Sequence, residues 1–277
     1  MTTANEAFPD RPVESHKAWK EMVHRYLAGA LVLLVLAINF LVFRPANPWR
    51  RHRFIAGFIL ALIIFQAALG MWTVTLKLLP LVVLAHLLGG LATFALLLWL
   101  ALRSRTPHYF DPNLAMRAVR PWIITALVVL IGQIVLGGWT SSNYSALACP
   151  DLPTCQGEYW PPADFRAGFT PQREVGLDYE GGVLDLKARV AIHLAHRIGA
   201  VLTLVILCVV AFRLMQTTTI PRAGAVLLIL VITQFSLGLL NIVHALPLVN
   251  AVAHNAVAAL LLAQLIWLLH RATRLRL

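Results

Sequence analysis

The strongest constraint on the fold is a set of seven apolar stretches, each about 20 residues long. As an α-helix, a stretch of that length crosses the ~30 Å hydrocarbon core of a bilayer. The composition agrees, because 59% of the residues are hydrophobic, 13% are charged and the mean hydropathy is +0.75. We therefore predict an all-α polytopic membrane protein, with transmembrane helices near residues 24–43, 54–76, 79–101, 121–140, 190–212, 223–244 and 247–269.

The arginines predict the orientation of these helices, because short loops rich in Lys and Arg stay in the cytoplasm during insertion. Arginines follow the first, third, fifth and seventh helices, whereas most acidic residues lie in the N-terminal tail or between the fourth and fifth helices. We predict an N-terminus outside and a C-terminus in the cytoplasm. The net charge of +11 fits this topology and contact with anionic lipid, and so apolar a chain argues against a nucleic-acid partner.

The chain also contains an internal duplication. Three copies of a Gln-x-x-Leu-Gly motif begin at Gln66, Gln133 and Gln234, and a His-Arg pair opens a helix in each half. The helix that carries Gln133 has no counterpart in the first half. We therefore predict a pseudo-twofold 4+4 bundle with one helix missing, shortened relative to an eight-helix parent.

This duplication predicts how the chain is divided. The N-terminal half-bundle is expected to contain three helices and the C-terminal half-bundle four. The predicted segments are an outer tail (1–20), the N-terminal half-bundle (21–101), a cytoplasmic linker (102–120), the C-terminal half-bundle (121–270) with an outer loop (141–189), and a cytoplasmic tail (271–277).

Each half carries two intramembrane histidines, His24 and His86 in the first and His196 and His254 in the second. At 1.5 Å per residue, all four lie about 10 Å below the outer surface. An ionisable side chain is costly in hydrocarbon and usually marks function. Two histidines at one depth on neighbouring helices can bind haem iron from both faces. Zinc fits less well, because no Cys, Asp or third His joins either pair at ligand spacing.

Charged residues beside these histidines separate the two halves. Arg25 and Arg197 are cations on the outer side, where haem propionates could hold them, although each could instead reach the lipid headgroups. Glu21 lies three residues before His24 and shares its helix face, whereas the matching residue before His196 is His193. One half could thus keep a permanent cofactor while the other acts on a substrate. Alternatively, Glu21 is only a solvated acidic residue near the helix N-terminus, where the helix dipole stabilises negative charge.

The outer loop contains Cys149 and Cys155, for which we expect a disulfide in an oxidising compartment. It could cover a haem edge or serve only as a structural link. Cys208 lies within a helix and is expected to be a packing residue. A small-residue packing face, with a haem-facing role as the alternative, is expected for six glycines: Gly70, Gly89, Gly90, Gly137, Gly138 and Gly238.

In combination, these features resemble the haem A synthase family over nearly the whole chain, from that family's second helix onward. The resemblance is carried by the His-Arg pairs, the Gln-x-x-Leu-Gly copies, His86 and His254, Glu21, and the loop sequence Cys-Pro-Asp-Leu-Pro-x-Cys-x-Gly. It implies that His196 and His254 hold haem b, that His24 and His86 line the site for the substrate haem O, and that Glu21 is catalytic. The implied enzyme is an oxidoreductase that converts a porphyrin methyl group into a formyl group by two hydroxylations with oxygen from water.

From the economy of the chain, we expect a bacterial plasma (inner) membrane. The resemblance further implies a haem O synthase that supplies the substrate, and terminal oxidase assembly factors that receive the product. The resemblance leaves open whether the protein forms a homo-oligomer. Two other classes stay open as well: a bis-His di-haem electron carrier like cytochrome b561, and a transporter with internal repeats. Four histidines on one side of the membrane argue against the first, and the lack of broken helices against the second.

Overall fold

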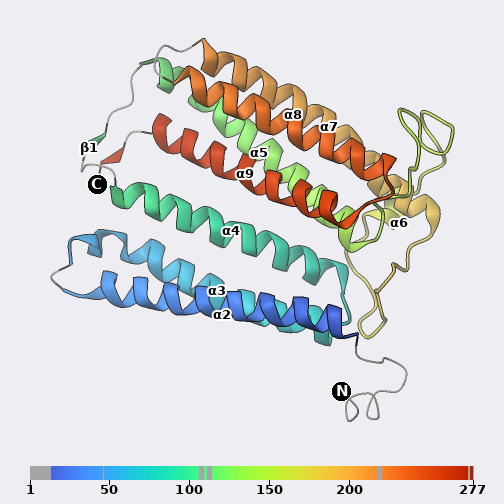
Figure 1. Ribbon diagram of the computed structural model, residues 1–277, viewed down its shortest axis with the longest axis horizontal. Coiled ribbons are helices and arrows are strands. Elements are labelled where there is room, and N and C mark those ends of the chain that lie inside the picture. Colours follow the sequence, from blue (N-terminus) through green and yellow to red (C-terminus); the bar gives the residue numbers. More distant parts are fainter. Residues whose placement is uncertain are drawn as a thin grey trace. The chain divides into compact units, whose positions relative to one another are not determined.

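The structure is a computed structural model that describes residues 14–45, 47–105, 109–110, 114–216, 220–273 and 275–276. This part of the chain contains seven helices long and apolar enough to cross a membrane, which confirms the predicted number (Figure 1). They are α2 (Ser15–Phe43), α3 (Arg53–Thr75), α4 (Pro80–Arg105), α5 (Leu114–Ser142), α7 (Leu186–Met215), α8 (Pro221–Val243) and α9 (Leu248–Ala272).

Four short elements complete the described part of the chain. The 3₁₀-helix η1 (Pro48–His52) precedes α3, and α6 (Phe165–Gly168) lies in the outer loop. Strands β1 (Tyr109–Phe110) and β2 (Leu275–Arg276) form one antiparallel pair, with Tyr109 opposite Arg276.

Most of the long helices extend beyond the apolar stretches from which they were predicted, whereas α3 matches its stretch to within one residue. α5 begins at Leu114 and carries Pro121 inside it, so residues 114–120 of the predicted linker are helical. Hydropathy detects only the hydrocarbon-facing part of a helix, whereas the backbone continues to form hydrogen bonds in the polar headgroup region.

The chain divides into two compact units, Met1–Ile63 and Ile64–Leu277, with the boundary inside α3. In the first unit, the buried side chain of Asn39 joins α2 to the start of α3. Its Nδ2 donates to the carbonyl oxygens of Val35 at 2.9 Å and Ala56 at 3.1 Å. The division into functional halves stays a prediction.

In the second unit, the contacts of α5, α7, α8 and α9 close into a ring, and these helices run alongside one another in Figure 1. α5 and α8 each pack against both α7 and α9, and α4 lies against α5 and α9. As a result, α7 and α9 lie across the bundle from each other. The core between the four helices includes the fully buried Leu207, Leu227 and Leu265.

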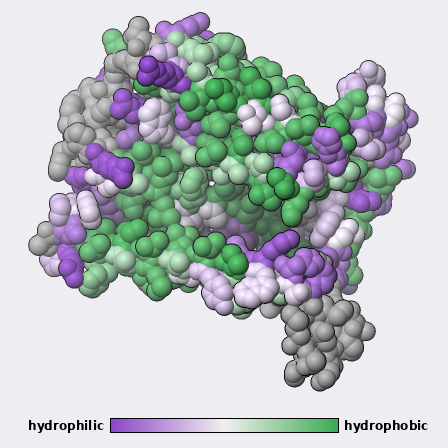
Figure 2. Space-filling view, viewed as in Figure 1, coloured by the Kyte–Doolittle hydropathy of each residue, from purple (hydrophilic) through white to green (hydrophobic). Residues whose placement is uncertain are grey.

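The outer faces of these helices are apolar, as expected for contact with lipid. Figure 2 shows hydrophobic residues along the sides of the long helices. On α7, Ile198, Val201, Leu202 and Val205 are each 53–55% exposed. The protein is a multi-pass membrane protein.

The duplication is visible in the backbone as well. Lys77 and Leu78, between α3 and α4, have φ angles of 49° and 60°, and Ala245 and Leu246, between α8 and α9, have φ angles of 52° and 63°. In both turns the second residue donates its N–H five residues back, to Thr73 and to Asn241 respectively. The two helical hairpins therefore end in the same turn, although neither turn contains a glycine.

Candidate functional site

The second unit brings His196 and His254 into one region. His196 lies on α7 and His254 on α9, across the helix ring, and both side chains are half-buried. The pairing of His196 with His254 stays a prediction.

Three histidine rings pack against the glycines of the repeated motif. A Cβ added at Gly137 would lie 3.1 Å from Cε1 of His196, and one added at Gly238 would lie 3.3 Å from Cε1 of His254. The same holds for Gly70, where the distance to Cε1 of His86 would be 3.2 Å. The small-residue packing face predicted from the motif is present, and the group it accommodates is an imidazole.

The motif glutamines contact the same histidines in the second half. Nε2 of Gln133 lies 3.1 Å from Nδ1 of His196 and donates to the carbonyl oxygen of His196 at 3.0 Å. Nε2 of Gln234 lies 3.2 Å from Nε2 of His254. Which ring nitrogen carries the proton depends on the tautomer, but each glutamine fixes the position of one nitrogen.

A second glycine lies beside each of two histidines, and sequence reasoning named Gly89 as a packing residue but missed Gly199. Gly89 and Gly199 each lie three residues after a histidine, and each contacts a motif glutamine, Gln66 or Gln133. A side chain at either glycine would overlap that glutamine. The signal was available in the sequence as a His-x-x-Gly pattern that occurs on both α4 and α7.

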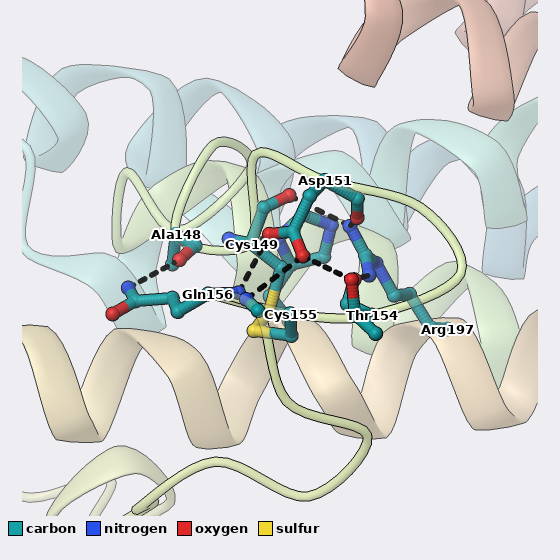
Figure 3. Close-up of a disulfide and its surroundings, with 9 residues drawn as sticks. Ala148, Cys149, Asp151, Thr154, Cys155, Gln156 and Arg197 are labelled. Atoms are coloured by element: carbon teal, nitrogen blue, oxygen red, sulfur yellow. Dashed lines mark hydrogen bonds between the residues drawn. A yellow bond between two sulfur atoms is a disulfide. The ribbon is translucent and has the colours of Figure 1, made fainter.

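The residues on either side of His196 bind the outer loop. The backbone N–H of Cys149 donates to Nδ1 of the buried His193 at 3.1 Å. Arg197 points into the loop and donates to three backbone carbonyls (Figure 3). The acceptors are Thr154 at 2.8 Å, Cys149 at 2.6 Å and Asp151 at 3.0 Å. These bonds occupy the two Nη groups of Arg197. The sequence had suggested a haem propionate as the partner of this guanidinium.

The loop itself is closed by covalent and polar contacts. Cys149 and Cys155 form a disulfide with a Cα–Cα distance of 4.5 Å. The Asp151 carboxylate accepts from the Thr154 hydroxyl and from the backbone N–H groups of Gln156 at 2.6 Å and Gly157 at 3.0 Å. These bonds favour the ionised carboxylate and lower the pKa of Asp151 from 3.8 to about 2, the Thr154 bond having the largest effect.

The predicted substrate residues lie in separate units. Glu21, His24 and Arg25 are exposed on α2 in the first unit, and His86 is half-buried on α4 in the second. Glu21 forms an ion pair with Arg25, one turn along the helix. The pairing of His24 with His86 stays a prediction.

Comparison with known proteins identifies the family. A family model described as "COX15-CtaA: Cytochrome oxidase assembly protein" matches residues 1–266. The chain belongs to this family. A relative from Shewanella oneidensis named heme A synthase is 47% identical over 96% of this chain and 80% of its own length. Relatives of the same name from Caulobacter vibrioides and Caulobacter sp. are 30% and 28% identical, over 92% and 91% of this chain and 74% and 73% of their own lengths.

The side chains at the C-terminal pair fit a haem. Gln133 contacts Nδ1 of His196, so the glutamine does not occupy Nε2 of that ring. Gln234 contacts Nε2 of His254, so the glutamine does not occupy Nδ1 of that ring. That Nδ1 is buried and has no hydrogen-bond partner in the described part of the chain. A histidine that binds a metal needs this division, with one nitrogen held by the protein and the other facing the metal. Two imidazoles across a helical bundle suit haem iron.

Proposed function

We propose that this chain is a haem A synthase, which oxidises a methyl group of haem O to the formyl group of haem A. Membership of the COX15-CtaA family supports this, as does the shared name of the relatives. The observation that carries most weight is the pair His196 and His254, each packed on a motif glycine and contacted by a motif glutamine. The same glycine and glutamine thus recur on α5 and α8, next to the two histidines.

We assign haem b to His196 and His254. When bound, haem b supplies one-electron chemistry. Gln133 and Gln234 orient the two rings, and the glycines keep the helices close enough for both rings to reach one plane. Arg197 keeps its Nε–H, which has no partner in the described part of the chain, as a donor for a propionate.

We assign the substrate haem O to His24 and His86. The sequence duplication supports this assignment, because these residues correspond to the other pair, and so does the packing of His86 on Gly70. Glu21 acts as a base that accepts a proton from the attacking water, and its carboxylate stabilises positive charge at the reacting carbon. Arg25 holds that carboxylate on the turn that carries His24, and serves as the cation for a propionate.

We place the protein in the plasma (inner) membrane of a bacterium, with its N-terminus outside and its C-terminus in the cytoplasm. The arginine distribution supports the orientation, and the bacterial sources of the relatives support the membrane. A haem O synthase and terminal oxidase assembly factors are the partners that this activity requires.

The test is conversion of haem O by the purified protein in lipid nanodiscs with a chemical electron acceptor in ¹⁸O-labelled water. We expect haem A carrying ¹⁸O in mass spectra recorded promptly after extraction, before the formyl oxygen exchanges. Unlabelled haem A added to the same labelled water measures that exchange. A protein that binds haem b and exchanges electrons but forms no haem A would instead be an electron carrier of the cytochrome b561 kind.

A further inference from the structure

The outer loop and the turn of α7 that carries His196 are connected more tightly than a surface loop requires. Four hydrogen bonds join them, one to His193 and three from Arg197. Both residues belong to the helical turn around His196. His193 is only 3% exposed, so its Nδ1 and the N–H of Cys149 have little access to water as an alternative partner.

The loop can act as a fixed support because it is held at other points. Within it, the disulfide and the Asp151 carboxylate fix residues 149–157. Further along, the N–H of Tyr179 donates to the carbonyl oxygen of Lys77, and Lys77 Nζ donates to Gly176. The indole of Trp139 on α5 donates to the carbonyl oxygen of Gly168 at 2.9 Å. The loop thus bonds to α5, to α7 and to the turn before α4.

Two attachments one turn apart restrict how a helix can rotate about its axis. Positions 193 and 197 are neighbours on one helix face. Without them, a rotation of α7 by about 10° would move a group about 5–6 Å from the axis by about 1 Å. A ligand histidine displaced by that distance would meet the iron at a different angle or not at all.

We propose that His193 and Arg197 are positioning residues that anchor α7 to the disulfide loop and so set the orientation of His196 toward haem b. This inference rests on the proposed haem b assignment. It gives a role to His193, at the position where the first half carries Glu21. It also makes the outer loop part of the cofactor site without any contact between loop and haem.

The test compares His193→Leu, which removes the acceptor, with His193→Asn, which keeps one near the position of Nδ1. Hydrogen–deuterium exchange of residues 148–157 in the purified protein reports the anchor independently of haem. We expect His193→Leu to raise exchange about 2- to 10-fold and His193→Asn to restore it. The matched control is Ile198→Ala, which alters an exposed side chain on the same helix and should change nothing.

The second readout is the low-spin electron paramagnetic resonance signal of ferric haem b, whose g values depend on the orientation of the axial imidazoles. We expect shifted g values in His193→Leu and Arg197→Gln, with recovery in His193→Asn. Increased loop exchange with unchanged g values would overturn the positioning role, and unchanged exchange would overturn the anchor. If His193→Leu fails to fold, His193→Phe takes its place, because it also removes the acceptor, whereas Arg197→Gln would in addition lose the proposed propionate contact. Wild-type protein without haem b would contradict the proposed function, whereas the exchange data would still test the anchor.

Discussion

The same His-Arg pair occurs on α2 and α7 but has different partners. On α7, His193 and Arg197 both bind the outer loop, so the residues around His196 are held by backbone groups. On α2, Glu21 and Arg25 bind each other at an exposed site. A neutral histidine can be buried as an acceptor for a backbone N–H, whereas a buried carboxylate would carry a costly charge. The copy on α7 is therefore held by the outer loop, whereas the charged side chains of the copy on α2 are exposed.

The largest expected effect would separate the two copies directly. His196→Ala should abolish bound haem b, because one of two axial ligands is lost, whereas His24→Ala should keep haem b and lose haem A formation. The measurements are the pyridine haemochrome content and the extracted haem profile. His244→Ala, at an exposed histidine after α8, is the control for general effects of losing a histidine. Equal loss of haem b in His24→Ala would remove the distinction between the copies.

Glu21→Gln should reduce haem A formation by about 10²-fold or more, because it replaces the proposed base with a neutral amide of the same shape. Haem b content should stay at the wild-type level. The rate is followed as haem A formed per bound haem b, with Glu21→Asp as the variant that keeps a carboxylate. A normal rate in Glu21→Gln would contradict the catalytic role and leave Glu21 only its stabilising role near the helix N-terminus.

A smaller effect would sharpen the α7 side of the comparison. Gly137→Ala places a Cβ 3.1 Å from Cε1 of His196, so the ring must shift, and we expect a loss of about 1–3 kcal/mol in stability with a change in the haem b spectrum. Gly132→Ala on the same helix meets nothing within 4 Å and should be neutral or slightly stabilising. Thermal unfolding of the two variants measures the difference. Identical behaviour would mean that the ring does not depend on the glycine.

The smallest effect concerns acid stability of the loop. Because folding lowers the pKa of Asp151 from 3.8 to about 2, its contribution is present above pH 3.8 and is lost as the pH falls toward 2. Protease cleavage of residues 149–157 should therefore increase over that range. Asp151→Asn should flatten this pH dependence, and an unchanged profile would show that another group controls the loop.

Much of the fold follows from local sequence patterns. Hydropathy predicted seven spans because a segment that crosses lipid needs apolar side chains and forms its backbone hydrogen bonds within its own helix. The Gln-x-x-Leu-Gly copies predicted the duplication, which reappears as identical turns at Lys77–Leu78 and Ala245–Leu246. Helix ends were less accurate, as at α5, because hydropathy does not register the part of a helix outside the hydrocarbon.

The sequence by itself determined the number of helices, the repeat and the histidines at matched positions, because these depend on composition and spacing along one segment. Only the tertiary structure decided what contacts them: the glycine under each ring, Gln133 beside His196, and the loop carbonyls around Arg197. Gln133 and the loop carbonyls lie more than 40 residues along the chain from His196 and Arg197. A long side chain such as arginine has several acceptors within reach, and the folded loop selects among them.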